Sequence, residues 1–241
     1  MKKVIAVLLV LCVAASLFAA VTVKAGFDFS AGSTKTLEDK GSGIKDVTLK
    51  THGVGFDIAV IGDVAPNLAV YGDVTAAFPI FFKSNFDGGS TEYTVIKADV
   101  ADVPAIDGTT YKFPGLKISN VSLRAGVLYK MKYQGLDLGF GGGLVYSITK
   151  YKAGDKDFNK YQRGISNNFG LSLYATGTYN VAKNVGVNLT INPDVFLYNY
   201  TANYFKGLYS YATDKETCVF EAYGMRLGFA FNASLGVAFS F

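Results

Sequence analysis

The sequence is poor in several residue types that mark common functional sites. It contains one histidine, two cysteines and no tryptophan. Two cysteines cannot build a zinc site, and Cys12 lies in a segment that we expect to be removed, which leaves Cys218 without a partner for an internal disulfide. We therefore expect no metal and no cofactor. The single histidine, His52, also argues against an enzyme, because general acid–base and nucleophilic catalysis commonly use a histidine in a defined arrangement with Asp or Ser.

Strong charge of one sign and long apolar runs are missing as well. The 23 Lys and Arg residues face 19 Asp and Glu residues, and a formal net charge of +4 is too small for a nucleic-acid-binding surface. Beyond the first twenty residues, no apolar run approaches the roughly 18 residues of a membrane-spanning helix. Helical membrane spans are excluded, and nucleic acid is not an expected partner.

The N-terminus has the composition of a secretory signal peptide. Lys2 and Lys3 form a basic start, and an apolar stretch and a run of small residues follow. The apolar stretch is shorter than the about 20 residues that a transmembrane helix needs. We expect cleavage near Ala20, which makes 1–20 a signal peptide and 21–241 the exported domain.

The C-terminal segment alternates strictly between two kinds of residue. Every second residue from Met225 to Phe241 is apolar, and every residue between them is small or polar. A period of two over this length predicts an extended strand with two unlike faces, because a helix would mix both sets on every face.

The same alternation recurs along the chain, and the links between the alternating segments differ in length. The predicted strands are 21–30, 53–60, 68–78, 121–131, 136–146, 169–176, 185–191 and 225–241. Short links at 62–67, 132–135 and 180–184 alternate with long ones at 31–45, 79–117, 149–166 and 201–217. Short turns at one end and long loops at the other are typical of membrane β-barrels. We predict an all-β, transmembrane up-and-down antiparallel barrel of about eight strands, with Pro193 at a bulge or where the seventh strand leaves the membrane.

Several features indicate that the apolar face points outward, to lipid. The interior of an eight-stranded barrel is just wide enough for side chains, and a row of small residues such as Gly139, Gly141 and Gly143 would crowd least there. The apolar rows are nearly free of charge. Aromatic residues near both ends of the predicted strands suggest two interfacial girdles.

The position of the charges supports the same orientation. The residues Asp57, Asp73, Arg124, Asp137 and Arg226 all share the face of small residues. Each Lys or Arg at mid-membrane on a lipid face costs about 2–4 kcal/mol, whereas a whole protein has only about 5–15 kcal/mol of net stability. We therefore predict that these residues face the lumen and fill it with a network of ion pairs. A gate, a proton path or a binding site is the alternative role. We expect Lys24, Asp28 and Lys130 nearer the rims, where they are weaker candidates.

With these features the chain resembles small bacterial outer-membrane barrels of the OmpA, OmpX and OmpW type. The most specific element is the C-terminal set Leu235, Val237, Phe239 and Phe241, which is similar to the signal that the barrel assembly machinery recognises. The resemblance implies an outer-membrane location, contact with lipid and no enzymatic activity. It leaves two roles open: a structural or surface-interaction barrel, with an extracellular ligand bound through 79–117 and 201–217, and a narrow channel or binding barrel for small or hydrophobic molecules. A soluble periplasmic ligand-binding barrel remains a further alternative.

Overall fold

Eight long strands form a barrel in the computed structural model, which describes residues 20–36, 47–86, 89–94, 101–104, 110–113, 117–155, 160–206 and 217–241. These strands are β1 (Val21–Thr36), β2 (Val47–Ala65), β3 (Leu68–Phe86), β7 (Lys117–Tyr133), β8 (Leu136–Asp155), β9 (Lys160–Ala182), β10 (Val185–Lys206) and β11 (Thr217–Ser240). Three short strands, β4 (Gly89–Thr94), β5 (Ala101–Pro104) and β6 (Thr110–Phe113), lie between β3 and β7 in the chain. The predicted signal peptide, except Ala20, lies outside the described residues.

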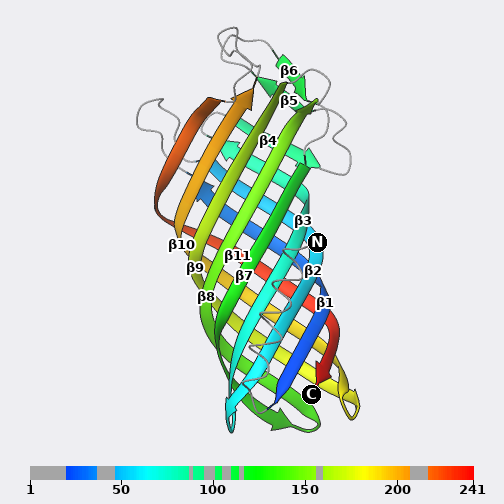
Figure 1. Ribbon diagram of the computed structural model, residues 1–241. Helices are drawn as coiled ribbons and strands as arrows, with labels where there is room; N and C mark the ends of the chain where they lie inside the picture. Colours follow the sequence, from blue (N-terminus) through cyan, green and yellow to red (C-terminus); the bar gives the residue numbers. More distant parts are fainter. Residues whose placement is uncertain are drawn as a thin grey trace.

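The long strands close into a ring in which every neighbouring pair is antiparallel (Figure 1). Strand β1 pairs with β2 on one side and with β11 on the other, which joins the first strand to the last. At this seam the amide of Phe241 donates a hydrogen bond to the carbonyl oxygen of Val21 at 2.8 Å. Closure removes the free sheet edges that hydrocarbon would leave unpaired. The predicted up-and-down antiparallel barrel is confirmed.

Three tight turns lie at the same end of the barrel as the C-terminus (Figure 1), and we name this the short-turn end. They fall at 66–67, 134–135 and 183–184, inside the predicted short links. Gln134 and Gly135 have φ values of 47° and 82°, which are the positive values of a two-residue hairpin turn. We name the opposite end, where the long predicted links lie, the long-loop end.

Every one of the eight strands extends beyond its predicted bounds, mostly toward the long-loop end. The predicted loop 149–166 is largely strand, since β8 continues to Asp155 and β9 starts at Lys160. The hydropathy alternation disappears where the outer face meets water instead of lipid, although the backbone ladder continues. Sequence periodicity therefore located the membrane band better than it located the strand ends.

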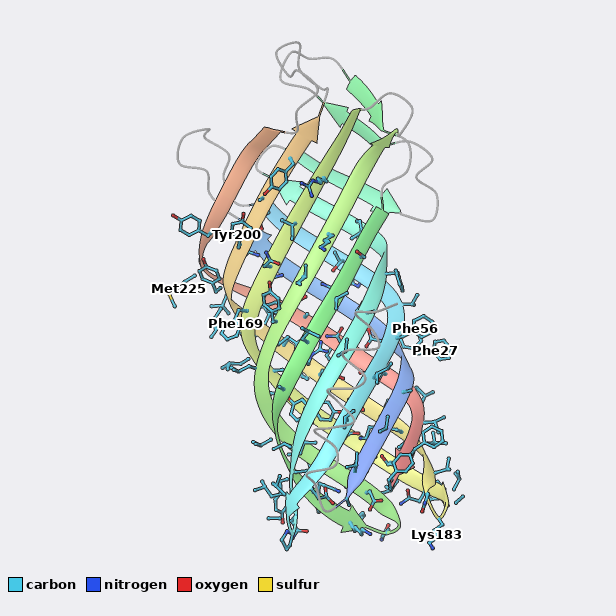
Figure 2. The ribbon with its side chains drawn as sticks, in the orientation of Figure 1. Phe27, Phe56, Phe169, Lys183, Tyr200 and Met225 are labelled. Atoms are coloured by element: carbon cyan, nitrogen blue, oxygen red, sulfur yellow. The ribbon has the colours of Figure 1, made fainter. Side chains whose placement is uncertain are left out.

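The outer surface is a continuous apolar girdle, as the alternation predicted. Phe27 and Phe56 point away from the barrel on one side, and Phe169 and Met225 do so on another (Figure 2). The exposed aromatic residues Tyr129, Tyr133, Tyr179, Phe239 and Phe241 lie toward the short-turn end, and Phe78, Tyr146 and Phe231 lie toward the long-loop end. In β7 the exposed apolar row runs from Val121 to Tyr133, and its twelve residue-to-residue steps rise about 30 Å at roughly 3.3 Å per step and a tilt of about 40°. This height matches a bilayer's hydrocarbon core of about 30 Å.

In the part of the chain that the structure describes, no helix is long and apolar enough to cross a lipid bilayer.

Pro193 lies within β10, and of its two predicted positions the one at a bulge is wrong. The pairing of β10 with β11 runs through Pro193, opposite Phe231. On the other side, the ladder with β9 stops after Ile191 and resumes in the same register at Asp194. The missing amide proton of proline is thus accommodated by a gap in one ladder, and the register shift of β10 comes later, next to Leu197.

Candidate functional site: the layered lumen

The centre of the lumen holds an ion cluster built around Arg124 of β7. Arg124 Nη1 donates to Asp73 Oδ1 of the neighbouring β3 at 2.7 Å and to Thr75 Oγ1 at 2.8 Å. Its Nη2 and Nε donate to the two carboxylate oxygens of Asp194 on β10, at 2.7 and 3.0 Å. Asn232 of β11 donates a further bond to Asp194 at 3.2 Å. The side chains of Arg124, Asp73 and Asp194 are fully buried, so the cluster ties four strands together across the interior.

The structure describes the side chains of four of the five predicted lumen charges, and these four do not form one group. Asp73 and Arg124 are in the ion cluster, and Asp57 lies in the lumen at 2% exposure, with its Oδ2 unpartnered. Asp137 lies apart, half-buried at the short-turn end, where it accepts a hydrogen bond from Asn180 at 2.7 Å. Arg226 belongs to β11, but its side chain lies outside the described residues.

Sequence reasoning missed one member of the cluster and misplaced two other charged residues. Asp194 lies beyond 185–191, the predicted seventh strand; the inward parity of Asn188, Thr190 and Asn192 leads directly to it. Lys24 and Asp28 were expected near the rims. They are instead 4% and 1% exposed, inside the barrel.

A tyrosine pair closes the lumen next to the ion cluster, on its short-turn side. Tyr71 of β3 and Tyr174 of β9 meet across the lumen with ring centroids 4.3 Å apart, and both are buried. Tyr71 lies opposite Gly126 in the pairing of β3 with β7, and Tyr174 lies opposite Gly141 in that of β8 with β9. A side chain at Gly126 would overlap the backbone of β8. Each of the two large rings thus lies opposite an inward-facing glycine on a neighbouring strand.

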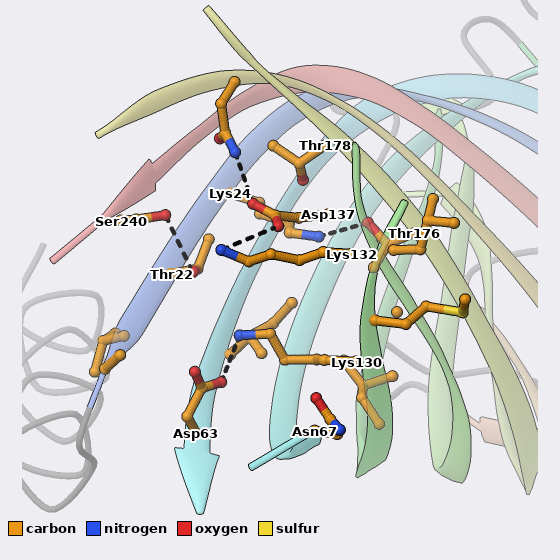
Figure 3. Close-up of a pocket in the computed structure, with 18 of the residues that line it drawn as sticks. Thr22, Lys24, Asp63, Asn67, Lys130, Lys132, Asp137, Thr176, Thr178 and Ser240 are labelled. Carbon is orange, nitrogen blue, oxygen red and sulfur yellow. Dashed lines mark hydrogen bonds and ion pairs between the residues drawn. The ribbon is translucent and has the colours of Figure 1, made fainter. Parts of the chain in front are cut away.

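Beyond the tyrosine pair, the lumen opens at the short-turn end into a cavity of about 610 Å³, which we name the vestibule (Figure 3). Ion pairs lie at its mouth. Lys130 Nζ is 2.6 Å from Asp63 Oδ1, and Lys132 Nζ is 3.8 Å from Asp137 Oδ1. Lys183 also lines this mouth.

The floor of the vestibule carries a hydrogen-bond network centred on a threonine of β9. Lys24 Nζ of β1 reaches across the lumen and donates to Thr176 Oγ1 (Figure 3). Thr176 Oγ1 also accepts a bond from Asn188 Nδ2 at 2.8 Å and lies 3.2 Å from Thr190 Oγ1. Asn188 Nδ2 reaches Thr178 Oγ1 at 2.9 Å as well. The network fixes the ammonium of Lys24 at the deepest part of the vestibule.

On the long-loop side of the ion cluster, uncharged hydroxyl and amide groups fill the lumen. Asn120 Nδ2 donates to Ser147 Oγ at 2.9 Å, and Asn199 Nδ2 donates to Ser166 Oγ at 3.0 Å. They surround a cavity of about 50 Å³, and no residue that lines it carries a charge. A space of this size holds one or two water molecules and no organic solute.

The described residues offer little for catalysis by a metal or by histidine. No group of three or more His, Cys, Asp or Glu side chains among them is arranged to hold a metal ion. His52 lies on β2 with an exposed side chain, opposite Ala31 of β1. It therefore belongs to the outward row, as its parity indicated, and not to the lumen.

Comparison with solved structures shows the fold. The outer membrane protein OprG from Pseudomonas aeruginosa matches with a TM-score of 0.54 over 93% of this chain and 96% of that protein, at 12% identity. A major outer membrane protein from Thermus thermophilus matches with a TM-score of 0.52 over 90% of this chain and 99% of that protein, at 17% identity. No protein-family model and no curated protein sequence matches the chain. The likeness establishes the fold, and together with the apolar girdle it identifies an outer-membrane β-barrel.

Proposed function

We propose that this protein is a non-conducting outer-membrane barrel with a structural or surface-interaction role. The observation that carries the proposal is that three side-chain contacts cross the lumen at successive depths. They are the contact of Lys24 with Thr176, the stack of Tyr71 on Tyr174 and the ion pair of Arg124 with Asp194. Each contact joins two strands that are three places apart in the ring of eight, so each spans the lumen.

The buried ion pair is the strongest obstacle to transport. A solute that passed would have to break fully buried, charge-assisted hydrogen bonds between Arg124 and two carboxylates. The tyrosine pair adds an aromatic layer directly beside it. A narrow channel would need the ion cluster and the tyrosine pair to move together. A soluble periplasmic barrel would leave the large apolar girdle exposed to water.

Conductance in a planar lipid bilayer tests the proposal. We expect no stepwise conductance from barrels whose folding is verified by faster gel migration without boiling. Stepwise currents that change in a Tyr174→Ala variant, and not in the outward-facing control Leu173→Ala, would support the narrow channel instead. Recovery only in the soluble fraction, without a mobility shift, would support the soluble barrel.

A surface role is supported by structure at the long-loop end. Strands β9, β10 and β11 have 23, 22 and 24 residues, whereas a tilted strand crosses a bilayer with about 9–11. The excess length forms a wall beyond the membrane band. The link 79–117 continues β3, pairs it with β4 and contains the β5–β6 hairpin. We place this end outside the cell and assign an extracellular ligand to this link and to 201–217.

Export and assembly complete the proposal. Residues 1–20 act as a cleaved signal peptide, and 21–241 form the barrel domain. Leu235, Val237, Phe239 and Phe241 are outward-facing in β11 and at its end, next to the seam with β1 where the barrel closes. This position suits recognition by the barrel assembly machinery before closure. Removal of Phe241 should lower the yield of heat-modifiable barrel in the outer membrane, and an unchanged yield would contradict the assignment.

A further inference from the structure

The vestibule contains a buried ammonium, that of Lys24, which forms no ion pair with any described side chain, although the carboxyl group of Asp57 lies within electrostatic reach. Lys24 is 4% exposed and donates to the neutral hydroxyl of Thr176. The ion pairs among the described vestibule residues join Lys130 to Asp63 and Lys132 to Asp137, and neither includes Lys24. Burial of an unpaired charge is costly. The site therefore favours a ligand that brings one negative charge to this depth.

The walls around Lys24 differ in chemistry from one side to the other. Strands β1 and β9 contribute the hydroxyl groups of Thr22, Thr176 and Thr178, whereas β2 and β7 contribute the side chains of Ile61 and Leu128. Ile61 and Leu128 belong to the apolar core cluster beneath the tyrosine pair. A ligand that fills this space needs a polar head on one side and hydrocarbon on the other.

The mouth and the volume of the vestibule fit a small organic anion. Three lysines, Lys130, Lys132 and Lys183, face two aspartates, Asp63 and Asp137, around the opening. The resulting excess of positive charge attracts anions. The volume of about 610 Å³ lies within the range of about 300–1,000 Å³ that is typical of small-molecule sites.

We propose that the vestibule binds a small monocarboxylate with a short hydrocarbon chain. The carboxylate pairs with the ammonium of Lys24, and the chain packs against Ile61 and Leu128. A monoanion fits better than a phosphate dianion, because the floor offers one buried cation. The ligand enters from the short-turn end and stops at the tyrosine pair, so the site is independent of whether the barrel conducts.

Calorimetric titration of the folded barrel in matched non-ionic detergent micelles tests the proposal, with hexanoate as the probe. We expect saturable binding of one hexanoate per barrel. Lys24→Met keeps the length of the side chain and removes its charge, and it should weaken binding about ten- to a hundredfold, as expected for a lost hydrogen bond to a charged group. The control Lys150→Met removes an exposed lysine near the long-loop end of β8, outside the vestibule, and it should leave the affinity within about threefold.

Two further probes on the unaltered protein keep the test independent of any variant. Hexanol has the same chain without the charge and should bind at least about tenfold more weakly, and inorganic phosphate should not displace hexanoate at equal concentration. The proposal is overturned if hexanoate does not saturate, if hexanol binds equally well, or if a folded Lys24→Met barrel retains full affinity.

Discussion

Replacement of Arg124 by methionine tests whether the ion cluster stabilises the barrel. The guanidinium donates to Asp73, Thr75 and Asp194. Without it, two fully buried carboxylates lose their charged partner. Removal of one partner of a buried ion pair typically costs about 3–5 kcal/mol, most of which is the penalty of leaving a charge buried and unpaired. We expect Arg124→Met to lower the free energy of unfolding by this amount.

Urea titration of the barrel in lipid vesicles measures the effect, with the folded fraction read from the mobility of unboiled samples. With a slope of about 3 kcal/mol per M, which is at the upper end of the usual range, a loss of about 3–5 kcal/mol lowers the midpoint by about 1–1.7 M. A conservative control is Arg124→Lys. It keeps one charge but cannot contact both carboxylates with a planar fork, so its stability should fall between that of the unaltered protein and that of Arg124→Met.

The decisive comparison is a triple variant, Arg124→Met with Asp73→Asn and Asp194→Asn. It removes the guanidinium and both buried charges at once. If uncompensated charge causes the loss, the triple variant recovers most of the stability of the unaltered protein. If it is as unstable as Arg124→Met, packing of the arginine stem, and not charge compensation, holds the centre of the lumen, and the reasoning is refuted.

Three further predictions follow from single positions and use the same urea titration. Both carboxylate oxygens of the buried Asp28 lack a hydrogen-bond partner, so Asp28→Asn should raise the unfolding free energy by about 1 kcal/mol, and a loss of stability would contradict this account. Gly126→Ala should lower the unfolding free energy by about 1–3 kcal/mol, because its Cβ would overlap the backbone of β8. The control Gly72→Ala, which has open space around the Cβ, should change the unfolding free energy little. Equal effects of the two substitutions would show that the strands adjust freely. Leu173→Arg, in the middle of the lipid-facing band of β9, should cost about 2–4 kcal/mol, whereas Tyr179→Arg on the same strand near the short-turn end should cost only about 0–1 kcal/mol; a reversed order would contradict the placement of the membrane band.

The barrel was predictable because one physical rule governs its whole length. Side chains alternate between lipid and lumen, so a period of two appears in the sequence wherever the strand lies in the membrane. Strand number, the outward face and the tight turns all follow from it. The strand ends did not follow, because outside the membrane both faces can be polar and the period disappears while the ladder continues.

The layers of the lumen were only partly predictable. Periodicity places Asp73, Arg124 and Asp137 on the inner face, but their depth depends on register. Register can be read from the sequence where a tight turn sets it: the turn at 134–135 pairs Lys132 with Asp137 and so puts Asp137 at the rim. The contact of Arg124 with Asp194 joins strands that are not neighbours in the ring. It depends on the curvature and stagger of the barrel, which no local pattern records.

The order of the layers makes the two proposals, a non-conducting lumen and a ligand-binding vestibule, compatible with each other. A carboxylate that enters at the short-turn end first meets the ammonium of Lys24. The next layers are the buried rings of Tyr71 and Tyr174 and then a centre in which the carboxyl groups of Asp28, Asp57, Asp73 and Asp194 outnumber the single guanidinium of Arg124. Binding of an anion would be favourable beside Lys24. It would be unfavourable at the tyrosine pair and again beside the central carboxyl groups. On these proposals, the vestibule is a blind site that would hold a monocarboxylate and would not pass it on.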